Sequence, residues 1–148
     1  MFVFLFVGVN HISLVFSTGL TSSLEAKVWV DETPFEVSGD MFFALGGGAR
    51  KGRERAAVRA PPLFHGLQFY FHGQHEKPPQ ADLSQLVKEG GGTVVTRKPA
   101  ASSQKKADLV VLFDPSTFLD PNGLASLRKI ATVKESSWVL SCISNYER

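Results

Sequence analysis

Cysteine and net charge are both scarce in this chain. Its single cysteine, Cys142, excludes a disulfide framework and a cysteine-based zinc site within the chain, and favours a reducing compartment. Charged residues make up 20% of the sequence and the formal net charge is +2, which is too small to indicate nucleic acid binding by itself. Hydrophobic residues make up 43% of the 148 residues, enough to bury the core of one ordinary domain.

The N-terminal segment, residues 1–22, also lacks charge. No Asp, Glu, Lys or Arg occurs in the first twenty residues, which are rich in Phe, Val and Leu and so resemble a signal peptide. A secretory signal begins with a basic residue, but none precedes Lys27, and Asn10 and His11 interrupt the apolar run that a spanning helix needs. We therefore interpret this segment as buried or aberrant, in preference to a signal or a membrane anchor.

Residues 23–60 have the composition of a linker. Pro34 opposes helix formation in their first half, and a glycine triplet at 46–48 opens the second half. Five basic residues with one acid among them then precede Pro61: Arg50, Lys51, Arg53, Arg55 and Arg59. This basic run is suited to a weak contact with DNA phosphates, to an acidic protein face or to nuclear import; a solvated, mobile loop is the alternative.

Residues 61–148 begin with the pattern of a βαβ unit. The aromatic run at 67–71 predicts a strand. Leu83, Leu86 and Val87 then share one face of a helix at 82–89. The glycines at 90–92 end this helix, because glycine adopts a positive φ without steric penalty, and four β-branched residues follow as a second strand.

The rest of the chain repeats this alternation. Residues 107–113 contain a continuous apolar run from Leu109 to Leu112, which predicts a third strand covered on both faces. Asp120 and Pro121 are typical of the start of a helix, and residues 130–133 predict a short fourth strand. A last helix at 136–146 places Trp138 on one apolar stripe with Cys142 and Tyr146. The order predicts an α/β domain of three layers, α/β/α, with a four-stranded parallel sheet and three helices.

This order, together with the glycines after LSQLVKEGG and the tryptophan in ESSWVLSC, resembles a BRCT repeat over about residues 62–146. PPLFHGLQFYFHG, DLSQLVKEGGG and VVTRKP resemble, more narrowly, the second BRCT repeat of the BRCA-associated RING family. LEAKVWVDETPFEVSGD resembles the end of a first repeat and its linker, so the resemblance implies a truncated tandem pair in which residues 23–60 are the remnant and 61–148 the BRCT domain.

The same resemblance implies a function. The chain would be a nuclear protein–protein interaction module of a DNA-damage-response ubiquitin-ligase scaffold. Its partners would be repair factors or chromatin, without a small-molecule substrate, a cofactor or a catalytic role of its own. Gly91, Gly92 and Trp138 would be structural: the glycines permit a close approach of helix to strand, and the tryptophan is buried against the sheet.

The resemblance also locates candidate binding residues. In tandem pairs of this family a phosphoserine pocket uses Ser or Thr followed by Gly after the first strand, and Lys at the start of the second helix. The matching positions here are His72-Gly73 and residues 120–123, so we expect no phosphoserine pocket. Arg97 matches a basic position that faces the acidic histone surface in the resembled protein, and Lys98 adjoins it. An exposed loop arginine without a partner is the alternative.

A second class of function is a small doubly wound enzyme domain that binds a nucleotide or a phosphate at the ends of its strands. Neither glycine triplet has the GK[ST] ending of a phosphate-binding loop. His65, His72 and His75 lack the further ligands that complete a zinc site, and Cys142 has no base near it in the sequence. The sequence therefore predicts no catalytic, metal-binding or cofactor-binding residues.

Overall fold

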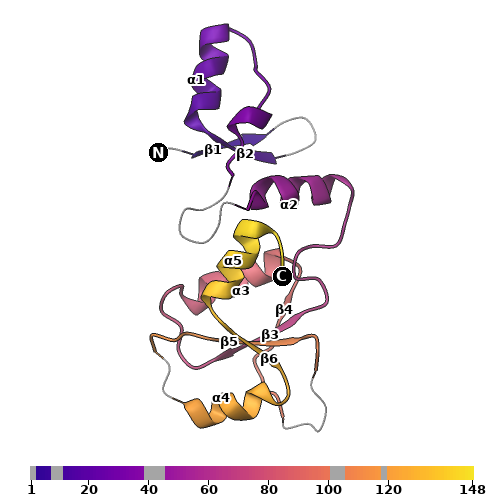
Figure 1. Cartoon of the computed structure of the whole chain (residues 1–148), viewed down its shortest axis with the longest axis vertical. Coiled ribbons are helices and arrows are strands. Elements are labelled where there is room, and N and C mark those ends of the chain that lie inside the picture. Colours follow the sequence, from indigo (N-terminus) through magenta and orange to yellow (C-terminus); the bar gives the residue numbers. More distant parts are fainter. Residues whose placement is uncertain (1–2, 8–11, 39–45, 101–105, 118–119) are drawn as a thin grey trace. The chain divides into compact units, whose positions relative to one another are not determined.

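The computed structural model describes residues 3–7, 12–38, 46–100, 106–117 and 120–148, with the backbone alone before residue 17. The chain divides into two compact units. One contains Met1–Pro61 together with Cys142–Glu147, and the other contains Pro62–Ser141 with Arg148. Figure 1 labels the elements of both.

The second unit is built on a four-stranded sheet in which the strand order is β4-β3-β5-β6 and every pair is parallel. The β3–β5 pair is the longest, with Gln68 opposite Leu109 and His72 opposite Phe113. The last strand begins two residues later than the sequence predicts. The four strands are β3 (Gln68–His72), β4 (Thr93–Val94), β5 (Leu109–Phe113) and β6 (Thr132–Glu135).

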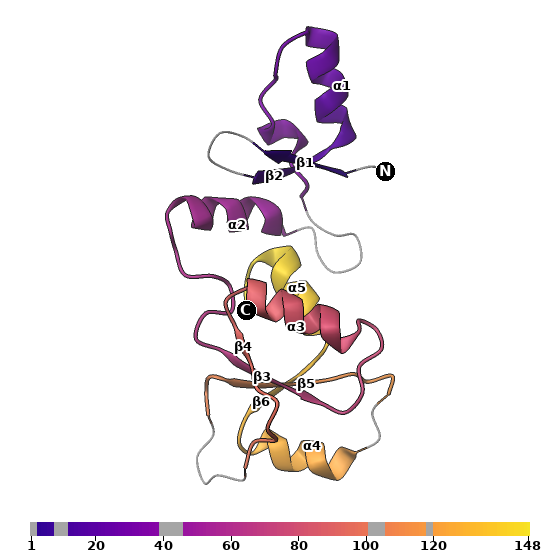
Figure 2. The ribbon, with the colours of Figure 1, turned by 180° about the vertical axis from the view of Figure 1, so that it is seen from behind.

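Three helices cover this sheet: α3 (Gln80–Glu89), α4 (Pro121–Arg128) and α5 (Ser137–Asn145). Opposite views show α3 and α5 on one face and α4 on the other (Figures 1 and 2). The α/β/α layers, the parallel sheet and the three helices of this domain confirm the predicted fold class.

Apolar side chains pack on both faces of the sheet, and the central strand β5 is therefore buried on both sides. Leu109 and Val111 pack with residues around the end of α4, and that cluster also contains Leu127, Ile130 and Ala131. On the face of α3 and α5, Phe64, Phe69 and Val87 are fully buried. Full burial of each such side chain contributes about 1.5–3 kcal/mol to stability.

The first unit starts with a pair of antiparallel strands, β1 (Val3–Val7) and β2 (Ile12–Phe16). Helix α1 (Ser17–Ala26) follows at once, and a single 3-10 turn, η1 (Thr33–Phe35), comes after it. The apolar N-terminal segment thus contains two strands and the beginning of a helix. Across the described part of the chain, no helix combines the length and the hydropathy that a membrane span requires.

Helix α2 (Gly48–Ala57) lies where the sequence predicts a linker, and for these residues that prediction is wrong. Residues 39–45 of the predicted linker fall outside the described residues. Gly48 and Gly52 are four positions apart, so they share the helix face that packs against the last residues of the chain. A Cβ on Gly52 would lie 3.0 Å from the ring of Tyr146. This packing outweighs the low helix propensity of glycine.

Candidate functional site

The carboxyl ends of β3, β5 and β6 meet at one edge of the sheet, because these strands are parallel. His72 ends β3, Asp114 follows β5 and Ser136 follows β6, and all three are buried. In open α/β sheets ligands bind at this edge. Its chemistry therefore bears on the choice between an interaction domain and a ligand-binding enzyme domain.

Asp114 organises this edge as a hydrogen-bond acceptor. Its carboxylate accepts from the Ser116 hydroxyl at 2.6 Å and backbone amide at 2.9 Å, and from the backbone amides of Glu76 at 3.0 Å and Lys77 at 3.3 Å. The Ser116 hydroxyl and these amides hold the pKa of Asp114 well below its usual range. The Asp114 carboxylate is thus a fixed negative charge whose oxygens already accept hydrogen bonds from the protein itself. This arrangement disfavours an anionic ligand.

His75 and Ser136 form a second buried contact at this edge. The Ser136 hydroxyl donates to the backbone oxygen of Phe113 at 3.0 Å, and the Nδ1 atom of His75 lies 2.7 Å from the same hydroxyl oxygen. Because the Ser136 hydroxyl donates its single proton to the Phe113 oxygen, the Nδ1 atom of His75 carries a proton and donates it to the Ser136 hydroxyl oxygen. The sequence gives no signal for this contact, because its partners are 61 residues apart.

The start of α4 carries an acid where the phosphoserine pocket of the resembled family has a lysine. Asp120 accepts from the backbone amide of Gly123 at 2.8 Å and so caps the helix. Its second oxygen lies 3.6 Å from Nε2 of His72. A carboxylate at this point repels phosphate, which supports the expectation that no phosphoserine pocket is present.

The histidines and acids at this edge do not form a metal site. Among the residues that the structure describes, no three His, Cys, Asp or Glu side chains are placed to hold a metal ion. Cys142 is buried in α5. The geometry offers no cofactor ligand set within the described ranges.

The predicted structural residues lie around the end of α3 and the start of α5. Gly91 adopts a φ of +81°, the conformation that suits glycine after a helix. A Cβ on Gly92 would lie 2.9 Å from the ring of Phe69, so this glycine allows strand and helix to approach closely. Trp138 is only half-buried, with its ring centroid 6.3 Å from that of Phe64, whereas the adjacent Val139 is fully buried.

Arg97 and Lys98 are the predicted partner-binding residues, and both are exposed. They follow β4, the edge strand, and therefore lie beyond its carboxyl end. Within the described part of the chain, neither side chain has an ion-pair partner. The structure thus leaves two adjacent positive charges accessible in the segment that follows the edge strand.

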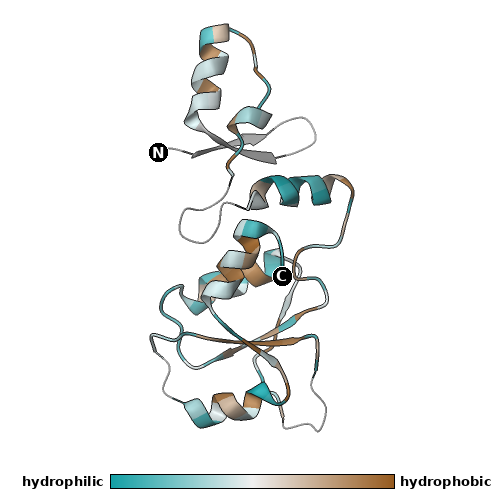
Figure 3. Ribbon diagram, viewed as in Figure 1, coloured by the Kyte–Doolittle hydropathy of each residue, from teal (hydrophilic) through white to brown (hydrophobic). Residues whose placement is uncertain are grey.

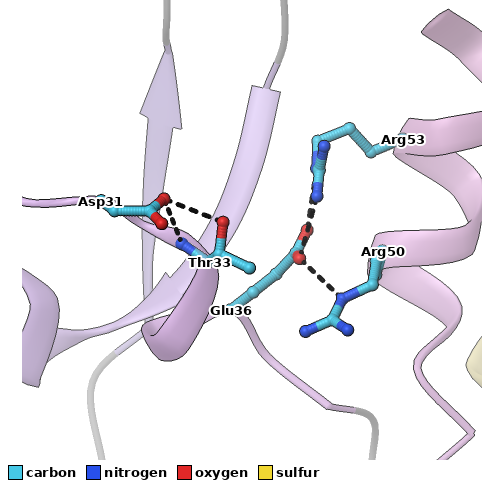
Figure 4. A network of polar contacts seen from close by, with 5 residues as sticks. All are labelled: Asp31, Thr33, Glu36, Arg50 and Arg53. Carbon is cyan, nitrogen blue, oxygen red and sulfur yellow. Dashed lines mark hydrogen bonds and ion pairs between the residues drawn. The ribbon is translucent and has the colours of Figure 1, made fainter.

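The first unit contains an ion-pair cluster that the sequence analysis missed. Glu36 has a side chain 2% exposed, and its carboxylate accepts from Arg53 at 2.9 and 3.1 Å and from Arg50 at 3.2 Å (Figure 4). The hydrogen bonds from Arg53, aided by the one from Arg50, lower the pKa of Glu36. Arg50 and Arg53 are 14 and 17 residues from Glu36 in the sequence. Their own spacing of three residues places both on one face of a helix, and this was the signal in the sequence that they could bind the same carboxylate.

Other basic residues of α2 are engaged in the same unit. The Lys51 ammonium contacts the backbone oxygen of Asn145 and the carboxylate of Glu147, and Arg55 lies 6.0 Å from the ring centroid of Tyr146. Helix α2 is strongly hydrophilic, as Figure 3 shows, yet much of its charge is matched by its own unit. This weakens the interpretation of the basic run as a site for DNA phosphates.

The fold and the site together define a class: a parallel α/β domain in which buried polar groups close the carboxyl end of the sheet and an exposed basic pair follows the edge strand. Residues 62–148 match the BRCT domain family, and the chain belongs to that family. The resemblance seen in the glycine triplet and in ESSWVLSC is thereby confirmed.

Curated relatives agree with this assignment. The chain is 42% identical over 76 residues to BRCA1-associated RING domain protein 1 of Arabidopsis thaliana, covering 51% of this chain and 10% of the relative. It is 34% identical over 125 residues to Protein BREAST CANCER SUSCEPTIBILITY 1 homolog of the same plant, covering 78% and 13%. The mouse BRCA1-associated RING domain protein 1 is 32% identical over 80 residues, covering 54% and 9%. The chain thus spans only a small part of the length of these relatives.

Proposed function

We propose that this chain is a protein–protein interaction module of a nuclear DNA-damage-response ubiquitin-ligase scaffold that contacts chromatin or repair factors. One observation carries the proposal: the carboxyl end of the sheet, where a ligand would bind, is occupied by the hydrogen bonds of Asp114, while Arg97 and Lys98 after β4 are exposed. The kinship with proteins named for the RING domain and for breast cancer susceptibility supports the setting.

Arg97 is the residue that the proposal places at the centre of the contact. A guanidinium forms two parallel hydrogen bonds to a carboxylate, so it is suited to an acidic protein surface such as the acidic face of a nucleosome. Lys98 adds a second positive charge at the same place. Charges of this kind raise the association rate and set partner choice, and the contact should weaken with salt.

The test is binding of the full chain to reconstituted nucleosomes, with and without ubiquitin on the histones. Arg97→Glu reverses the charge and should weaken binding by about tenfold or more, the equivalent of one lost charge-assisted contact. Lys129→Glu is the matched control, because Lys129 is exposed at the C-cap of α4 and undergoes the same change of charge. Equal binding by the parent and Arg97→Glu, with both folded, would refute the proposed role of Arg97.

Two further measurements distinguish this function from phosphoserine binding and from nucleotide binding. A phosphoserine peptide should show no phosphate-dependent binding, because Asp120 stands where the pocket has a lysine. A thermal-shift panel of nucleotides should leave the melting temperature unchanged. A clear stabilisation by a nucleotide would instead favour the small doubly wound enzyme domain.

A further inference from the structure

We propose that His75 is an acid-sensitive latch that fastens the loop between β3 and α3, residues 73–79, to the junction of β6 and α5. His75 is 8% exposed, and its ring reaches Ser136 through the Nδ1 proton. This inference is independent of the partner that the domain binds.

The latch depends on the second ring nitrogen. Nε2 of His75 is buried and has no hydrogen-bond partner among the described residues. In the neutral ring this atom has only a lone pair, which costs little to leave unmatched in an apolar setting. Protonation would place a positive charge and a new N–H group there without an acceptor, and burial of such a group is costly.

The groups around the ring favour the neutral form on balance. Burial lowers the pKa of His75; the charge of Asp114 at the end of β5 acts against that shift, and His72 at the end of β3 reinforces it. Asp120, the N-cap of α4, approaches His72, with 3.6 Å between its Oδ2 and Nε2 of that histidine. The remaining contacts, the Ser136 hydroxyl and the Phe71 ring at 5.2 Å, bring no charge.

Release of His75 would loosen a loop that also shapes the sheet edge. The same loop is tied to Asp114 by the amides of Glu76 and Lys77, and the Thr117 hydroxyl donates to the backbone oxygen of Gln74. Because the pKa of His75 is lower in the folded chain than in the unfolded chain, the latch contributes fully above the unfolded pKa. Its contribution falls as the pH drops below that value, by up to about tenfold in the unfolding constant per pH unit.

The experiment uses the full chain. The pKa of each histidine is measured by NMR titration of its Cε1 proton, and unfolding by urea is compared at pH 7.5, 6.5 and 5.5 for the parent, His75→Asn and His65→Asn. An asparagine amide can still donate to Ser136 but does not titrate. His65 is exposed, so its replacement is the matched control.

The proposal predicts that His75 titrates below the ordinary histidine range and that the parent and His65→Asn lose stability between pH 7.5 and 5.5. It also predicts that His75→Asn loses less stability over the same pH range. In the parent, the amide hydrogens of Glu76 and Lys77 should exchange faster at the lower pH, after correction for the intrinsic exchange rate. A His75 that titrates at or above its ordinary pKa would overturn the latch even if His75→Asn fails to fold. Equal pH dependence of the parent and His75→Asn would also overturn it.

Discussion

Replacement of three glycines by alanine separates backbone strain from steric overlap: Gly91 and Gly92 follow α3, and Gly73, which follows β3, is the reference for strain alone. Gly73 has a φ of +84° and open space around it, so alanine there adds only the strain of the left-handed region, roughly 1 kcal/mol. Gly92 has no positive φ, but its Cβ would lie 2.9 Å from Phe69, 3.0 Å from Val87 and 3.1 Å from Phe64, all fully buried. Overlap with such a core costs about 1–3 kcal/mol.

Gly91→Ala combines both effects, because its φ is +81° and its Cβ would lie 2.7 Å from Cβ of Pro62. Free energies of unfolding from urea titrations should therefore fall by roughly 3 kcal/mol for Gly91→Ala, roughly 2 for Gly92→Ala and roughly 1 for Gly73→Ala. If Gly92→Ala were no less stable than Gly73→Ala, the close approach of strand and helix would not be the role of this glycine.

Three other substitutions test the packing and the charge clusters. Trp138→Ala should lower the free energy of unfolding by about 3 kcal/mol, through lost contact with Phe64 and with the Lys134 ammonium 5.4 Å from its ring, and a cooperative melt at the parent temperature would contradict this. Asp114→Ala should lower the free energy of unfolding by about 3 kcal/mol, because it leaves the amides of Glu76 and Lys77 without their acceptor. Since the pKa of Asp114 is lowered in the folded chain, this contribution should stay constant from pH 7 to 5 and disappear only in stronger acid. A contribution already lost at pH 5 would be inconsistent with this account. Glu36→Gln should reduce the hydrogen-exchange protection of α2, because Arg50 and Arg53 lose a nearly buried carboxylate, whereas Glu25→Gln on exposed helix α1 should leave that protection unchanged.

The domain of residues 62–148 could be predicted from the sequence because its signals are local. A strand of aromatic residues, an apolar helix face and a glycine triplet each specify their own conformation over a few residues. The last strand was misplaced by two residues, since Ile130 and Ala131 are as apolar as a strand but are buried at the end of α4. The half-burial of Trp138 shows the same limit, because the rotation of a helix on its sheet depends on packing and not on periodicity alone.

The site could be predicted only where single residues were sufficient. Arg97 and Lys98 lie exposed where the sequence placed them, although their partner stays a proposal. The contacts of Asp114, and that of His75 with Ser136, join residues about 40 and 61 positions apart, and no local pattern marks such pairs. Helix α2 was missed because its glycines and charges are typical of a linker, whereas tertiary contacts stabilise it as a helix.

The central claim is that the basic pair after β4 faces a protein partner. Site-specific photo-crosslinking tests it most directly: a photoreactive amino acid replaces Lys98 in one variant and Arg128, exposed at the end of α4, in another. With nucleosomes, the account predicts a crosslink to histone from position 98 and little or none from position 128. Crosslinks of equal yield from both positions, or from position 128 alone, would contradict it.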